Sequence, residues 1–252
     1  MTATASLWRL TRAEARKLFT TRTVPVTFAA AIALVLVSVV LQAAIAGQQG
    51  QPRLGTDEST YKLLSIGVVP VLVMLIIGII ASGGEFRHRT IVPTLLATPS
   101  RGRVFAVKVL VIAVIGAIFS AITFGLGLGA VVAELSAHHL HHLPAGTGGL
   151  YAGAVIASTC FGMIGVALGA LIRNTVGAIV AVIGWTILIE MIILEAVVPS
   201  IERWLPTRAA VMLTSTPDST HLPLVTASLL LTGYAAAILV VACRTTLNRD
   251  IA

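Results

Sequence analysis

The acidic residues that could do chemistry lie in one long apolar stretch. Glu190 stands well inside the run from 174 to 198, and Glu195 follows about one helical turn later. Burial of a carboxyl group in a membrane is costly, so such acids usually serve binding or proton transfer. Glu190 is therefore a candidate intramembrane polar site. The alternative is that the apolar run ends near Glu190, which would leave both acids in the external interface.

A histidine cluster is the second candidate, formed by His138, His139, His141 and His142. Pairs three or four residues apart can share a helical face and bind a transition metal. The cluster contains no cysteine, and its nearest carboxylate is Glu134. We interpret the segment as a solvated polar loop and predict no metal site, although the sequence does not reveal what role the histidines have.

Motifs for enzymatic chemistry are missing from the sequence. It contains no Gly-x-x-x-x-Gly-Lys-Ser/Thr loop to hold phosphates, no His-Glu-x-x-His and no Gly-x-Ser-x-Gly. We therefore expect that the chain is not an enzyme, and that it carries no catalytic residue and no cofactor of its own.

The fold class follows from the composition of the chain. The chain of 252 residues is 57% hydrophobic and 11% charged, whereas soluble domains average about 25% charged residues. A helical span needs about 20 apolar residues, and lipid tolerates only hydrogen-bonded backbone. We predict an all-α polytopic membrane protein, a single transmembrane domain over 1–252. Its six spans are expected at about 24–46, 63–84, 109–133, 150–172, 174–198 and 222–243.

The basic residues are unevenly distributed between the two sets of segments that join these spans. One set has thirteen: Arg9, Arg12, Arg16, Lys17, Arg22, Arg87, Arg89, Arg101, Arg103, Lys108, Arg173, Arg244 and Arg249. The other set has four: Arg53, Lys62, Arg203 and Arg208. The positive-inside rule places the first set in the cytoplasm. We therefore expect a multi-pass protein of the cell membrane with both termini cytoplasmic. The net charge of +7 serves topology, so no nucleic-acid partner is predicted.

The segment before the first span, 3–22, is amphipathic. At 100° per residue, Arg9, Arg12 and Arg16 share one face. The residues roughly opposite are Leu7, Thr11, Ala15 and Leu18. This pattern predicts an interfacial helix with its arginines toward anionic lipid headgroups. The alternative is a disordered basic tail.

Small residues recur at the spacing of close helix packing in two of the predicted spans. They are Gly125, Gly127 and Gly129 in the third span, and Gly162, Gly165 and Gly169 in the fourth. Such spacing lets two helix backbones approach closely. We predict that these glycines pack within the chain.

The second cytoplasmic segment, 85–103, is longer than a connector between two spans requires. Thr90 can cap a short helix. That helix would carry Ile91, Leu95 and Leu96 between basic flanks. An apolar helix exposed outside the membrane predicts a docking surface.

This region resembles the cytoplasmic coupling region of the ATP-binding-cassette type-2 exporter permeases, the membrane-spanning subunits of that family. The residues that match are Glu85, Arg87, Thr90, Leu95, Leu96, Pro99, Ser100, Arg101 and Lys108. The order of elements matches along the whole chain, from the amphipathic entry helix to the Arg-Asp-Ile ending at 249–251. Arg89 departs from the pattern, because such permeases often have glycine there.

The resemblance implies a transport subunit driven by a separate ATPase. Two copies of the ATPase, which bind ATP and Mg, and a second permease, identical or a paralogue, would complete the exporter. The residues expected to couple to the ATPase are Glu85, Arg87, Arg89, Thr90, Ile91, Leu95, Leu96 and Arg101. A hydrophobic or amphipathic substrate is expected, but the sequence does not identify it. The alternative function is a proton-coupled secondary transporter that uses Glu190.

Overall fold

The computed structural model describes residues 3–48, 51–87, 100–140, 143–186, 190, 204–215 and 223–248. All regular structure in these ranges is helical, which confirms the predicted all-α class for the described part of the chain. The elements are α1 (Ala3–Thr20), α2 (Thr23–Ile45), α3 (Asp57–Leu64), the 3₁₀ turn η1 (Ser65–Gly67), α4 (Val68–Arg87), α6 (Arg101–Ala137), α7 (Thr147–Ile172), α8 (Thr175–Gly184), α11 (Pro206–Thr214) and α12 (Leu224–Asn248).

Five helical stretches of the described chain are long and apolar enough to cross a membrane. They are Thr23–Ile45, Asp57–Glu85, Arg101–Ala137, Thr147–Ile172 and Leu224–Thr246. The chain is thus a polytopic membrane protein, and these stretches correspond to the predicted first, second, third, fourth and sixth spans. The predicted fifth span is described only to residue 186 and at Glu190. Its described helix, α8, has 10 residues, so the count of six spans stays a prediction.

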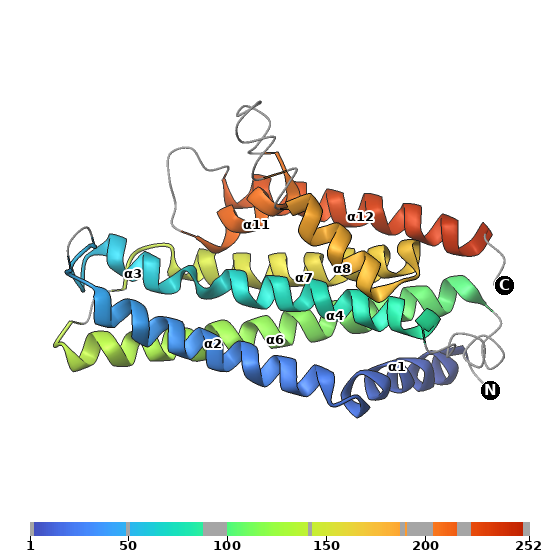
Figure 1. The fold of residues 1–252 in the computed structure, drawn as a ribbon, viewed down its shortest axis with the longest axis horizontal. Helices are drawn as coiled ribbons and strands as arrows, with labels where there is room; N and C mark the ends of the chain where they lie inside the picture. The colour runs from blue at the N-terminus through green and yellow to red at the C-terminus, as the bar shows by residue number, and fades with distance from the viewer. Residues whose placement is uncertain are drawn as a thin grey trace.

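The long helices lie side by side along the long axis of the molecule (Figure 1). The chain passes back and forth, so α1, the end of α4, the start of α6, the end of α7 and the end of α12 all lie at one end of the bundle. We call this the α1 end. The described parts of the segments predicted to be cytoplasmic are therefore together at one end of the molecule.

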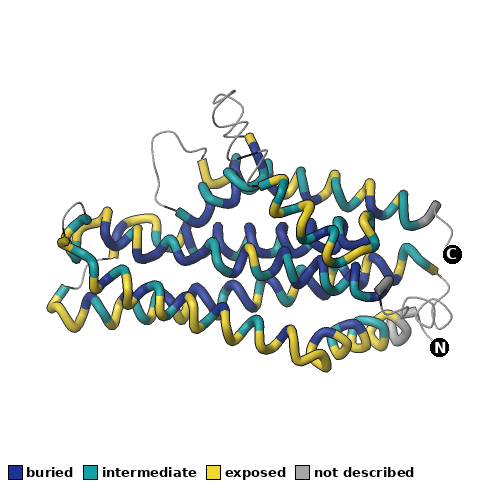
Figure 2. The backbone as a smooth tube through the Cα atoms, viewed as in Figure 1, coloured by how far each residue is buried: buried dark blue, intermediate teal, exposed yellow. Residues whose placement is uncertain are grey.

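Helices α4 and α7 form the centre of the bundle, where most of the buried residues lie (Figure 2). Their backbones touch because glycines face each other across the contact. A Cβ atom added to Gly165 of α7 would lie 2.2 Å from the carbonyl oxygen of Leu75, and one added to Gly78 of α4 would lie 2.2 Å from that of Gly162. The predicted packing role of the α7 glycines is confirmed, because they allow the backbones of α4 and α7 to come into direct contact.

The third-span glycines follow the prediction only in part. Gly127 of α6 faces inward, against the side chains of Ile66 and Val35. Gly125 and Gly129 have no described atom within 4 Å of an added Cβ, and both are exposed. The prediction that all three pack within the chain is therefore wrong for Gly125 and Gly129. Neighbours two residues apart on a helix point to different sides, so only one side could meet the core.

Candidate functional site

The connection between α1 and α2 is an elbow at Thr21 and Arg22. The hydroxyls of Thr20 and Thr21 donate to the carbonyls of Lys17 (3.0 Å) and Leu18 (2.8 Å), which satisfies acceptors that the end of α1 leaves open. A proline at the third position of α2, Pro25, is tolerated because the first turn of a helix needs no backbone donor there. The elbow turns α1 against the end of α4 and the start of α6.

The polar face of α1 agrees with the prediction, since Arg9, Arg12 and Arg16 are all exposed. The guanidinium of Arg12 lies over the ring of Trp8, 5.3 Å from its centroid. On the other side, Leu18 is buried, and with it an acidic residue, Glu14. A buried carboxylate requires partners, and the rest of the site supplies them.

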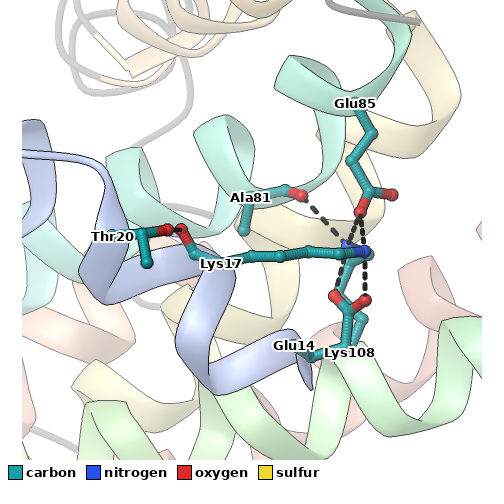
Figure 3. Close-up of polar contacts among 6 residues, drawn as sticks. All are labelled: Glu14, Lys17, Thr20, Ala81, Glu85 and Lys108. Atoms are coloured by element: carbon teal, nitrogen blue, oxygen red, sulfur yellow. Dashed lines mark hydrogen bonds and ion pairs between the residues drawn. The ribbon is translucent and has the colours of Figure 1, made fainter. Parts of the chain in front are cut away.

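Four charged side chains from three helices meet at the α1 end of the bundle (Figure 3). We call them the ionic cluster: Glu14 and Lys17 of α1, Glu85 of α4 and Lys108 of α6. The Nζ atom of Lys108 lies 2.8 Å from Oε2 of Glu14 and 2.8 Å from Oε1 of Glu85. The Nζ atom of Lys17 lies 2.6 Å from Oε1 of Glu14 and 3.1 Å from Oε1 of Glu85.

Lys108 is the buried centre of the ionic cluster. Its ammonium has three donors, and besides the two carboxylates it donates to the carbonyl of Ala81 at 3.1 Å. Glu14, Lys108 and Glu85 are only 4%, 6% and 9% exposed. Two lysines and two glutamates in direct contact balance each other's formal charge, which offsets part of the cost of burying them. The ion pairs of the cluster thus connect α1, α4 and α6 to one another.

The two α1 members of the cluster have shifted pKa values. Burial of the Glu14 carboxyl opposes its ionisation, but Lys108 and Lys17 favour the carboxylate more strongly, so the pKa of Glu14 lies below its ordinary value of 4.5. Burial of the Lys17 ammonium likewise opposes its charge, but Glu14 and Glu85 outweigh it, so the pKa of Lys17 lies above 10.5. Both groups are therefore held in their charged forms.

The contributions of Glu14 and Lys17 to the docking of α1 should consequently be insensitive to pH between 4.5 and 10.5. The titratable groups that face one another are Glu14, Lys17, Glu85 and Lys108. The contribution of Glu14 to stability is fully present above 4.5 and is lost as pH falls through its lowered pKa. The contribution of Lys17 is fully present below 10.5 and is lost as pH rises through its raised pKa.

Distances between spin labels at Ala13 and Arg103, exposed positions on α1 and α6, would measure this docking in a background without the native cysteines. We expect one distance across the neutral range and a longer, broader distribution in acid. Glu14→Gln should abolish the acid transition, and the exposed control Glu58→Gln should retain it. A transition centred near neutral pH would contradict the assignment.

The predicted ATPase-coupling residues fall on both sides of a segment that the structure does not describe. Glu85 belongs to the ionic cluster, Arg87 is the last residue of α4, and Arg101 is the first residue of α6. The remaining five lie outside the described residues: Arg89, Thr90, Ile91, Leu95 and Leu96. The structure thus brings Glu85, at one end of the predicted coupling region 85–103, against α1, and Lys108, five residues beyond the other end, contacts α1 as well.

Glu190 is buried, and its Oε1 atom accepts a hydrogen bond of 2.6 Å from Nε1 of Trp185. Its Oε2 atom has no hydrogen-bond partner among the described residues. Ser120, Thr123 and Ser158 are other buried polar side chains without such a partner in the described ranges. Glu190 is therefore buried within the chain, and its assignment as an intramembrane polar site stays a prediction.

The histidine cluster is described only in part, because His141 and His142 lie outside the described residues. His138 lies 3.8 Å from a carboxylate oxygen of Glu134, one helical turn earlier. Within the described ranges no group of three or more His, Cys, Asp or Glu side chains could hold a metal ion.

Sequence reasoning missed Glu14 and assigned no special role to Lys17. A signal was present, since Glu14 is the single acid before Asp57, and Lys17 is one of three lysines beside fourteen arginines. A compact ammonium suits a site in which one cation serves several acceptors. Lys108 was identified through the family resemblance, but its partner on α1 was not.

Comparison with known proteins does not assign the chain to a family. No protein-family model matches the sequence, and no curated protein matches it.

Proposed function

We propose that the chain is the membrane-spanning permease subunit of an ATP-driven exporter, energised by a separate ATPase subunit. The observation that carries the proposal is the ionic cluster. A permease that is energised by a separate ATPase must convert a displacement of its ATPase-binding segment into movement of its transmembrane helices. The ionic cluster lies next to the two ends of that proposed segment.

The segment 88–99 connects α4 to α6, and the ionic cluster holds both of those helices. Glu85 precedes the end of α4 at Arg87 by two residues, and Lys108 is the eighth residue of α6. Their side chains lie 2.8 Å apart, and both reach Glu14 or Lys17 on α1. Displacement of the segment would therefore move α1, α4 and α6 as one unit, which is the kind of rigid-body movement that couples two sites.

The remaining parts of the proposal follow from the resemblance and the charge distribution. Two copies of the ATPase would bind ATP and Mg and dock at the α1 end, which is the cytoplasmic side. A second permease, identical or a paralogue, would complete the path, with a sixth span over 174–198. The apolar composition favours a hydrophobic or amphipathic substrate moved out of the cytoplasm.

Leu95→Asp should detach the ATPase or uncouple its hydrolysis from transport, while the permease still inserts. An apolar side chain buried at an interface contributes roughly 1.5–3 kcal/mol, and tenfold in affinity corresponds to about 1.4 kcal/mol. The loss of this side chain should therefore weaken ATPase binding by roughly 10- to 100-fold. Co-purification of the proposed ATPase partner, and binding of that ATPase to permease in nanodiscs, would measure the effect.

The matched control is Leu143→Asp, an exposed leucine at the opposite end of the bundle. It should leave ATPase binding intact. Equal recovery of the ATPase with wild type and Leu95→Asp, with unchanged coupling, would show that the segment is only a connector and would contradict the proposal.

A proton-coupled secondary transporter is the second candidate, favoured by the burial of Glu190 and the unpartnered Oε2 atom in the described part of the chain. The two candidates differ in their energy source. Transport driven by a proton gradient without nucleotide, and lost in Glu190→Gln, would establish the second candidate and exclude the first.

A further inference from the structure

A cavity of about 470 Å³ opens at the α1 end of the bundle, beside the ionic cluster. It lies between the α1–α2 elbow, the last turns of α4 and the first turns of α6. Its apolar wall is made by Leu18, Val24, Ile80, Val111 and Ile112. This volume is within the range of pockets that bind small molecules, about 300–1,000 Å³.

Gly84 is a lining position that has room for a larger side chain. It lines the cavity, and a Cβ atom added to it would meet no described atom within 4 Å. By contrast, a Cβ atom added to Gly165 of α7 would lie 2.2 Å from a backbone oxygen of α4. Close packing of α4 against α7 therefore requires glycine at position 165 but not at position 84.

The chemistry of the walls indicates the kind of ligand. The charged groups at one side of the cavity are paired with one another and sum to zero, so they offer no net charge to a soluble ion. The remaining wall is aliphatic and lies where apolar helices begin and end, next to an interfacial helix. An aliphatic chain that enters from the membrane surface satisfies both conditions.

We propose that this cavity binds an acyl chain of a membrane phospholipid, with the headgroup at its mouth beside the partly exposed Lys17. The bound chain would contact α1, α2, α4 and α6 at once, and so would stabilise the elbow and the ionic cluster. This proposal does not depend on how the protein is energised, because the same pocket would exist in either kind of transporter.

Photo-crosslinking of the full-length chain in nanodiscs would test the proposal. The probe is a phospholipid with a diazirine at the end of one acyl chain, made with either a phosphatidylcholine or a phosphatidylglycerol headgroup and added as a minor component to phosphatidylcholine nanodiscs. After irradiation, mass spectrometry locates the adducts. We expect adducts concentrated on Leu18, Val24, Ile80 and Val111, with equal yield for the two headgroups because the chain is what the pocket recognises.

Gly84→Leu should fill the cavity and reduce these adducts several-fold, while adducts on the exposed face of α12 stay constant. The matched control is Gly233→Leu on α12, which also meets no described atom within 4 Å and should change nothing. Size-exclusion profiles and melting temperatures of both variants would show that the fold persists. If Gly84→Leu did not fold, Ala81→Leu, at another residue of the lining, would serve the same purpose.

Three outcomes would overturn the proposal. The first is an adduct pattern spread evenly over the lipid-facing helices and unaffected by Gly84→Leu. The second is labelling by the phosphatidylglycerol probe alone, which would assign recognition to the headgroup and the arginines of α1. The third is occupation of the cavity by residues 88–99 of the chain in place of lipid. This would be detected as crosslinks between that segment and a photoreactive residue introduced at position 84.

Discussion

Gly165→Leu should abolish the folded bundle. The first atom of the new side chain would lie 2.2 Å from the carbonyl oxygen of Leu75 and 3.0 Å from the nitrogen of Ile79. Both are backbone atoms of α4, so no rotamer change can relieve the clash and the two central helices must separate. Ordinary overpacking costs about 1–3 kcal/mol, and this change should exceed it. The measurement is the fraction of detergent-extracted protein that elutes as a single species, together with its melting temperature.

Gly125→Leu is the matched control for this prediction. Gly125 lies in the middle of α6, is exposed, and has no described atom within 4 Å of an added Cβ. Leucine is also a better helix former than glycine by nearly 1 kcal/mol, so this variant should be at least as stable as the wild type. Similar yields and melting temperatures for the two variants would show that α4 and α7 do not touch as described.

Lys108→Met should destabilise the protein by about 3–5 kcal/mol, the cost of leaving a buried charge without its partner. Methionine cannot donate to Glu14, Glu85 or the carbonyl of Ala81, all within 3.1 Å of Nζ in the wild type. Two buried carboxylates would then share the single ammonium of Lys17. The expected result is release of α1 from the bundle, seen as a lower unfolding midpoint and as new proteolytic cleavage within α1.

Charge balance distinguishes this effect from a simple loss of packing. The double variant Lys108→Met, Glu85→Gln removes one charge of each sign and should recover a large part of the lost stability, as a coupled pair does. The control Lys62→Met changes the one lysine outside the cluster, which is exposed, and should cost little. If Lys62→Met and Lys108→Met were equally costly, the cluster would have no special role in holding α1.

The candidate site could be predicted in part from the sequence. Glu85 and Lys108 were identified because their order along the chain resembles a family pattern, and the exposed arginine face of α1 followed from its periodicity. The burial of Glu14 could not be predicted, because an acidic residue among arginines on an amphipathic helix is expected to be exposed to solvent. Its burial depends on where α4 and α6 place Glu85 and Lys108.

The local part of the fold follows from the order of the amino acids alone. Long apolar runs require helices wherever they occur, because lipid offers no partner for open backbone groups, and five of the predicted spans are described as such helices. Tertiary structure alone decided which side of each helix is inside. It selected Gly127 rather than Gly125 for the core of α6, and it joined Glu14 to Lys108 across 94 positions of the chain. Hydrophobicity and helical periodicity act over neighbouring residues, whereas an ion pair between distant helices exists only once the bundle has brought them together.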